Sequence, residues 1–262
     1  VRAFIDRLKS LKKEIIFETD DLVYDPAFLV HMDYFQKMNA FERKLYENGV
    51  GGEILADPYV KVATTTTSFL AEKLREKGKK VFIMPNKLAQ EDIRIAETAL
   101  QLASKQDNVV RIGYLSGTRS HNKDFSTITG ALIQIFEKYP EVRLVLTGPI
   151  DTDEVLEKYA DRIERIPFMP RSKLFRHIAG LDINIAPLEL DNPFCESKSE
   201  LKFFEAGIVV VPTVAVANQT FREAIQDGVN GFVASGMDEW VGKLRKLIED
   251  EDLRNALGEA AR

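Results

Sequence analysis

The sequence of 262 residues is 45% hydrophobic and 29% charged, and its formal net charge is -5 at pH 7. This composition excludes a disordered chain and indicates a globular protein of one large domain or two ordinary ones. The mild acidic balance and the lack of any block rich in lysine and arginine argue against a nucleic-acid partner. A single cysteine, Cys195, excludes an internal disulfide framework and is typical of a reducing compartment.

The sequence also lacks the patterns of membrane insertion and secretion. No apolar run reaches the ~18 residues that a membrane span needs, and residues 1–13 contain no signal-peptide core. We therefore expect a cytoplasmic protein, with peripheral contact at the inner face of the cell membrane left open.

Residues 1–104 follow a helix-and-strand order. Helical patterns over 1–13, 28–48, 69–77 and 91–103 alternate with strands over 14–19, 60–67 and 80–84. This order predicts a parallel sheet with right-handed crossovers. Only about two and a half such units precede residue 90, fewer than a nucleotide-sized domain normally has, so we expect the first domain to lack its start.

Residues 105–236 alternate more regularly. Expected strands cover 109–115, 143–147, 163–168, 181–186, 209–214 and 232–234, with helices between them and two amphipathic helices over 237–262. Six strands alternating with helices predict a doubly wound sheet whose ligands bind beyond the carboxyl ends of the strands. The expected fold class is α/β, with two Rossmann-like parallel-sheet domains over 1–104 and 105–236 and C-terminal helices over 237–262.

Carboxylates end the first expected strand. Glu18, Asp20 and Asp21 stand where α/β proteins place ligand groups, and together they would suit a divalent cation. The competing interpretation is that the aspartates order a turn or cap a helix, as Asp commonly does.

The polar loop Ser116–Lys123 follows the first strand of the second domain. Gly117 would let the backbone approach a phosphate, and Thr118 would add a hydroxyl. The loop has the spacing of neither a P-loop nor a GxGxxG motif, so an ordinary polar turn remains open. His121 is a candidate general acid or base, or a residue that orders this turn.

The stretch 191–207 predicts a loop followed by a short helix. Ser197 and Glu200 have the spacing of a capping box, which predicts a helix beginning near Ser197 with an anion at its N-terminus. Lys198, Lys202 and Glu205 would then share one helical face and suit a phosphate with a sugar attached. Alternatively, the charged face is an ordinary solvent face.

Three motifs resemble a known family. They are Gly113-Tyr114-x-Ser116-Gly117-Thr118-x-x-His121-x-x-Asp124-Phe125, Leu146-Thr147-Gly148, and Asn192-Pro193-Phe194-x-x-Ser197-Lys198-Ser199-x-x-Lys202-Phe203-x-Glu205. Together they resemble the donor-binding half of retaining GT-B glycosyltransferases, nearest to the "group 1" branch that builds bacterial surface polysaccharides and includes rhamnosyltransferase-like members. The resemblance covers nearly all of 109–234. Glu18–Leu22 and Met84–Asn86 resemble the second half of the acceptor domain and its hinge.

The resemblance implies a role for each matching residue. Ser116, Gly117 and Thr118 match the turn that faces the diphosphate, and Phe168 and Met169 match the backbone segment that reads the base. Glu205 matches the second glutamate of the paired-glutamate motif, which holds the ribose. The spacing between Glu196 and Glu205 is one residue longer than the spacing between the family's two glutamates. The position that corresponds to the family's first glutamate is therefore occupied by Ser197. The catalytic candidates are His121, Lys198 and Lys202, and the acceptor-side candidates are Asp20 and Asp21.

The resemblance further implies a hexosyl- or other glycosyltransferase. Such an enzyme moves a sugar from a nucleotide-diphosphate donor to a hydroxyl of a saccharide or lipid-linked acceptor, with retention and without a metal or another cofactor, in polysaccharide or glycoconjugate biosynthesis. Because the first domain is expected to be incomplete, the chain should bind the donor better than it transfers the sugar. The alternatives are a non-catalytic nucleotide-sugar binding module of a larger protein and a nucleotide-sugar 2-epimerase, which would need a carboxylate and histidine set that His31, His121 and His177 do not convincingly supply.

Overall fold

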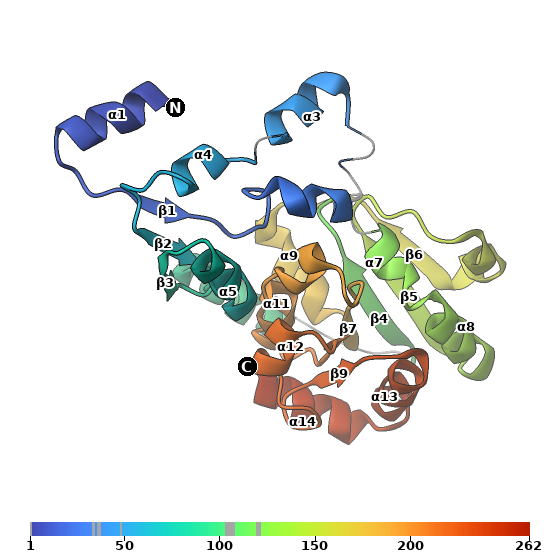
Figure 1. The fold of residues 1–262 in the computed structure, drawn as a ribbon. Helices are drawn as coiled ribbons and strands as arrows, with labels where there is room; N and C mark the ends of the chain where they lie inside the picture. Colours follow the sequence, from blue (N-terminus) through green and yellow to red (C-terminus); the bar gives the residue numbers. More distant parts are fainter. Residues whose placement is uncertain (1, 33–34, 36–37, 48, 103–107, 119–121) are drawn as a thin grey trace. The chain divides into compact units, whose positions relative to one another are not determined.

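The computed structural model describes residues 2–32, 35, 38–47, 49–102, 108–118 and 122–262. The chain forms two compact units (Figure 1). The first unit is Val1–Asn86 with Asp191–Ser199, and the second unit is Lys87–Leu190 with Glu200–Arg262. The division falls earlier than the boundary expected near residue 104, because helix α6 (Gln90–Leu102) packs against α9 (Arg171–Ala179) of the second unit.

The first unit is built on a parallel sheet with the order β1-β2-β3. Phe17 and Ala63 lie side by side in its register and face a core that also holds Leu22, Leu70 and Leu74. Its elements are α1 (Arg2–Ser10), β1 (Ile16–Glu18), η1 (Pro26–His31), α3 (Ala40–Tyr46), α4 (Gly52–Leu55), β2 (Val62–Thr65), α5 (Ser68–Glu76), β3 (Lys80–Ile83) and α10 (Pro193–Glu196).

Two helices of this unit differ from expectation because of their caps. The helix expected over 28–48 is divided, since Asn39 and Glu42 form a capping box that begins α3 anew. Helix α5 begins one residue earlier than expected, because the Thr67 hydroxyl accepts the Leu70 N–H at 3.2 Å. Gly78, at φ 75°, follows its end in the left-handed conformation that glycine adopts readily.

The second unit is a doubly wound sheet of six parallel strands in the order β6-β5-β4-β7-β8-β9. Its strands are β4 (Val110–Leu115), β5 (Val142–Thr147), β6 (Ile163–Ile166), β7 (Ile183–Ala186), β8 (Thr213–Val216) and β9 (Phe232–Ala234). The strand order reverses between β4 and β7, which makes this the topological switch point where ligands of such sheets bind. The prediction of a doubly wound second half is confirmed.

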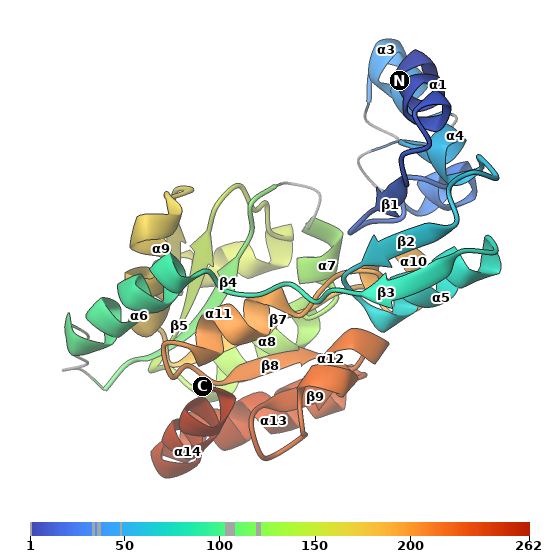
Figure 2. The ribbon, with the colours of Figure 1, turned by 90° about the vertical axis from the view of Figure 1, so that its left-hand side faces the viewer.

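Helices cover both faces of this sheet (Figure 2). Helices α6, α9 and α11 (Leu201–Gly207) pack together on one face, and α8 (Thr129–Lys138) packs on α13 (Met237–Glu249) on the other. Strands β7, β8 and β9 are accordingly buried on both sides and β4 and β5 are largely buried, as parallel strands usually are, whereas the edge strand β6 is partly exposed. The remaining helices in the described part of this unit are α7 (Asn122–Ser126), η3 (Glu154–Arg162), α12 (Gln219–Ala224) and α14 (Glu251–Ala261).

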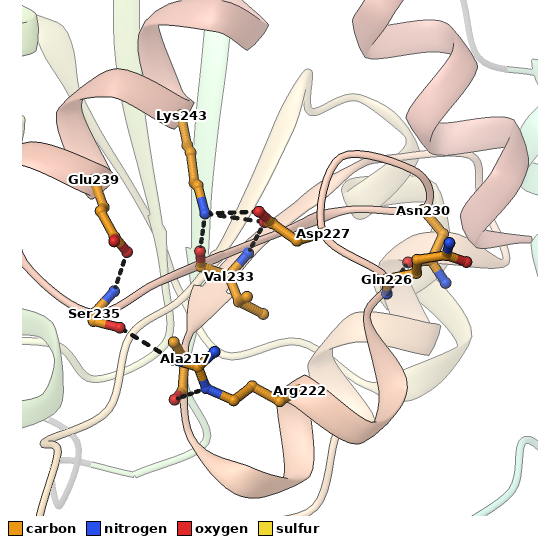
Figure 3. Close-up of polar contacts among 9 residues, drawn as sticks. All are labelled: Ala217, Arg222, Gln226, Asp227, Asn230, Val233, Ser235, Glu239 and Lys243. Atoms are coloured by element: carbon orange, nitrogen blue, oxygen red, sulfur yellow. Dashed lines mark hydrogen bonds and ion pairs between the residues drawn. The ribbon is translucent and has the colours of Figure 1, made fainter.

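The edge strand β9 is secured by a polar network around Asp227 (Figure 3). The Asp227 carboxylate accepts the Val233 N–H at 2.9 Å and the Lys243 ammonium at 3.0 Å. Lys243 also donates to the Val233 carbonyl. Asn230 closes the preceding turn by accepting the Gln226 N–H at 2.8 Å. The turn over 227–231 therefore joins α12 to β9, and Lys243 of α13 binds both the turn and the strand.

Helix α11 ends in a Schellman motif that places a valine in the left-handed region. The Val211 N–H donates to the Ala206 carbonyl at 3.0 Å and the Val210 N–H to Gly207 at 2.9 Å, which is the pattern of that motif. Val210 has φ 61°, a strained value for a β-branched residue. The strand expected from Val209 therefore begins only at Thr213.

Within the described ranges, none of the helices has both the length and the apolar character needed to cross a membrane.

Candidate functional site

A cavity of about 250 Å³ opens at the carboxyl edge of the six-stranded sheet in the second unit. It lies beside the switch point between β4 and β7, where the fold predicts a ligand. Five predicted donor-binding residues, Ser116, Gly117, Phe168, Met169 and Glu205, line it together with the catalytic candidate Lys202. The other lining residues are Leu115, Thr147, Arg171, Leu174, Ile178 and Asn184.

The turn after β4 is held by its own side chains. The Ser116 hydroxyl donates to the Thr118 carbonyl at 2.7 Å, while the Ser116 N–H donates to the Thr147 carbonyl at 2.9 Å. A Cβ atom on Gly117 would meet only open space, so the backbone there is accessible from the cavity. Gly148 has φ 93°, and a Cβ atom there would lie 1.9 Å from the Ser116 carbonyl oxygen. Glycine at 148 therefore allows this turn to pack against the end of β5.

Lys202 carries a positive charge into the cavity. Its ammonium donates to the Leu115 carbonyl and lies 5.2 Å from the centre of the Tyr114 ring. Burial of the ammonium lowers the pKa of Lys202, and the carboxylates of Glu205 and Asp124 oppose that change. The side chain is thus held at the carboxyl end of β4, next to the Ser116–Gly117 backbone.

Glu205 is paired with a residue that the sequence did not single out. Its Oε1 accepts a hydrogen bond from Arg171 Nη1 at 2.7 Å. Arg171 also donates from Nε and Nη2 to the Asp92 carboxylate, at 2.6 and 3.1 Å. These contacts raise the pKa of Arg171 and, through the arginine above all, lower the pKa of Asp92. Asp92, Arg171 and Glu205 form one ion-pair chain that ends at the cavity.

Part of the lining is apolar. Phe168, 70% exposed, and Met169 follow β6, and Leu174 and Ile178 lie on α9. The hydroxyl of Thr147, another lining residue, and His177 Nε2 are hydrogen-bonded at 2.7 Å, and burial lowers the pKa of His177. The cavity therefore combines apolar side chains, which suit a planar ligand, with two cations and a carboxylate.

The helix predicted to begin at Ser197 does not form, and this corrects the expectation of one charged face. Ser197 is buried at the end of α10, where its hydroxyl donates to the Phe194 carbonyl at 2.8 Å instead of capping a helix. Helix α11 begins only at Leu201, and its N-cap Glu200 makes no side-chain capping bond. Lys198 lies between the two helices, so it does not share a helical face with Lys202 and Glu205.

Several predicted residues belong to the first unit. Glu196 ends α10 beside Ser197, and the Lys198 ammonium pairs with the Asp21 carboxylate at 3.1 Å. The other Asp21 oxygen accepts the Leu22 N–H at 2.7 Å, so this aspartate orders the turn after β1, as the competing interpretation expected. Asp20 is exposed in the same turn. His121, the candidate general acid or base, lies outside the described residues.

Three candidate functional residues were not predicted from the sequence: Arg171, Asp92 and Asn184. Asn184 is a buried amide within the apolar strand β7, and it donates to the Lys202 carbonyl at 3.2 Å and to the Thr213 hydroxyl at 3.0 Å. A polar residue inside an apolar strand is a usable signal, because a buried amide needs partners. The Asp92–Arg171 pair joins residues far apart in the sequence, so no local pattern could have found it.

The family that these features indicate is confirmed by comparison. The family described as "Glycosyl transferases group 1" matches residues 109–250, which are 142 of the 262 residues. The chain belongs to this family, and the match covers nearly the whole of the doubly wound sheet. No curated protein sequence matches the chain significantly.

Solved structures show the same fold at low sequence identity. HepE (Alr3699) of Anabaena, solved in complex with UDP and glucose, is 16% identical with a TM-score of 0.62, over 97% of this chain and 67% of HepE. WaaG, a glycosyltransferase involved in lipopolysaccharide biosynthesis, is 15% identical with a TM-score of 0.68, over 99% and 75%. TarM of S. aureus, in a complex that includes UDP, is 13% identical with a TM-score of 0.58, over 80% of this chain and only 41% of TarM. The α/β fold of this chain is therefore of the GT-B type.

Proposed function

We propose that the cavity of the second unit binds a nucleoside-diphosphate sugar and that the protein transfers this sugar to a hydroxyl of a saccharide or lipid-linked acceptor. The observation that carries the proposal is the Lys202 ammonium, held by the Leu115 carbonyl beside the accessible backbone of Gly117. Arg171 is already paired with the carboxylates of Asp92 and Glu205, whereas the Lys202 ammonium donates to a carbonyl, so Lys202 is the cation of the lining that would attract an anion.

The chemistry follows from where charge develops. Breaking the bond between the sugar and the diphosphate leaves negative charge on the leaving phosphate. A fixed ammonium in a partly desolvated site stabilises that charge more than water does, because its orientation is set before the reaction. Lys202 is held in this way, whereas Lys198 pairs with Asp21 in the first unit. We therefore assign the phosphate contact to Lys202, the base to the segment Phe168–Met169 and the ribose to Glu205.

The finer properties belong to the same proposal. We propose transfer with retention, with no metal ion for the chemical step and with the developing charge compensated by Lys202, in the synthesis of a polysaccharide or glycoconjugate. The solved relatives support a test with uridine nucleotides, since HepE and TarM were crystallised with UDP.

Calorimetric titration with UDP, GDP and dTDP, each with and without EDTA, tests donor binding and its independence of metal. Lys202→Met keeps the length of the side chain and removes its charge, so we expect about 10- to 100-fold weaker binding, the value of a hydrogen bond to a charged group. Lys173→Met on the exposed side of α9 is the matched control. Unchanged affinity in Lys202→Met, or no binding of any of the three by the wild type, would overturn the proposed site.

Transfer needs a separate measurement. Proton NMR of UDP-glucose incubated with the protein follows release or transfer of the sugar, and the anomer that first forms reports retention or inversion. We expect the α anomer to appear first. Binding of the nucleotide with no turnover would instead favour a non-catalytic binding module, and a β anomer would refute retention.

A further inference from the structure

The ion-pair chain at the cavity joins three helices of the second unit. Asp92 lies on α6, Arg171 begins α9 and Glu205 lies on α11. The side chains of Asp92 and Glu205 are only 11% and 13% exposed, whereas that of Arg171, which lines the cavity, is 44% exposed. The two carboxylates are therefore largely shielded from solvent and the guanidinium is partly open to it, so these pairs are screened less than pairs with both partners exposed.

Asp92 fixes the guanidinium of Arg171. The carboxylate binds it through two parallel hydrogen bonds and also accepts the Ala89 N–H at 3.0 Å. The guanidinium lies 5.3 Å from the centre of the Phe175 ring, so a second contact limits its position. A bidentate arginine–carboxylate pair sets the plane as well as the place of the guanidinium. Nη1 is thereby directed at Glu205.

The contact uses one oxygen of Glu205 and leaves the other. Among the residues that the structure describes, Arg171 is the hydrogen-bond donor to Glu205, and it engages Oε1. Oε2 stays available to a ligand in the cavity. Lys202, three residues earlier on the same helix, is the competing cation, since residues at this spacing are neighbours on a helical surface. In the structure Lys202 donates instead to the Leu115 carbonyl.

We propose that Arg171, held by Asp92, is a positioning residue that fixes the Glu205 carboxylate for the ribose hydroxyls of the nucleotide and keeps it from neutralising Lys202. The proposal rests on the donor site proposed above. It assigns different tasks to the two cations of the cavity. Arg171 compensates the carboxylate, and Lys202 remains free for a phosphate oxygen.

The test compares UDP with 2′,3′-dideoxy-UDP by calorimetric titration, with GDP and its dideoxy form as the second pair. Glu205 should give the wild type about tenfold or greater preference for the ribonucleotide, because the hydroxyls donate to a charged acceptor. In Arg171→Leu we expect this preference to fall toward one and the affinity for UDP to fall as well. Arg171→Lys should restore part of the preference, and Asp92→Asn should reduce it. Arg176→Leu removes the same charge from an exposed position of α9 and serves as the matched control.

The ratio of the two affinities separates positioning from a general structural role, because a partly unfolded variant would lose both affinities together. Fluorescence of Trp240 shows whether each variant is folded. If Arg171→Leu does not fold, Arg171→Lys and Asp92→Asn are used for the comparison instead. A wild-type preference retained in all three variants would overturn the inference, as would a wild type that binds both nucleotides equally. A wild type that binds neither pair would instead refute the donor site itself.

Discussion

Gly148 connects the stability of the second unit to the shape of the cavity. Substitution by alanine adds a Cβ atom 1.9 Å from the Ser116 carbonyl oxygen, in a backbone conformation with φ 93°. The neighbouring atom belongs to the backbone, so it cannot move aside as the end of a flexible side chain would. Either the turn after β4 or the end of β5 must shift.

The expected loss follows from two contributions. A residue other than glycine held in this region costs about 1–3 kcal/mol, and an overpacked contact adds about 1–3 kcal/mol. We therefore expect Gly148→Ala to lower the free energy of unfolding by about 2–6 kcal/mol, a large part of the about 5–15 kcal/mol typical of a domain. The displaced Ser116 turn should also weaken nucleotide binding.

Trp240 provides the assay. It is the single tryptophan of the sequence and is 4% exposed on α13, so its fluorescence during urea denaturation follows the second unit. Gly242→Ala is the control with the opposite sign, because Gly242 lies inside the same helix with open space around it. Alanine there should stabilise by about 0.5–1 kcal/mol. A midpoint for Gly148→Ala equal to that of the wild type would refute the packing of Gly148 against Ser116.

Two further outcomes concern the same unit. Val210→Gly should raise the free energy of unfolding by about 0.5–1 kcal/mol, since the left-handed conformation costs a β-branched residue more than glycine loses in backbone entropy; a lower denaturation midpoint would contradict this. Burial lowers the pKa of His177 below its ordinary 6.5, so the unfolded chain binds the proton more readily. The contribution of neutral His177 to the free energy of unfolding should be full above about pH 6.5 and should be lost as the pH falls from there toward the pKa of His177 in the folded protein. The free energy of unfolding of His177→Gln should therefore change less with pH than that of the wild type between about pH 7.5 and 5.5. Equal slopes in the two proteins would contradict the assignment to His177.

Several parts of the site could be predicted because they depend on local pattern. The order of strands and helices in the second unit followed from short apolar segments separated by polar turns, and the rule that ligands lie at the carboxyl edge then selected the loop after β4. Ser116 and Gly117 line the cavity for this reason, and Phe168 and Met169, expected from the family resemblance, line it as well.

The local pattern gave wrong helix boundaries where the same residues could adopt two different local structures. Ser197 and Glu200 have capping-box spacing, but the chain buries the Ser197 hydroxyl against the Phe194 carbonyl and begins the next helix at Leu201. Burial of Phe194 in the core of the first unit stabilises this alternative, and no pattern within 191–207 reveals that core. Similarly, capping at Asn39 divided a segment whose periodicity suggested one helix.

Chain order was enough to predict the class of fold and the doubly wound second unit, and six of the twelve residues that line its cavity were named from the sequence. Which charges meet depended on how the helices and strands pack in three dimensions. Arg171 reaches Asp92 and Glu205 across 79 and 34 residues, Asn184 reaches Thr213 across 29, and Lys198 pairs with Asp21 across 177. The partner of a long polar side chain depends on distance and desolvation in the packed structure, and the spacing of residues along the chain gives neither quantity.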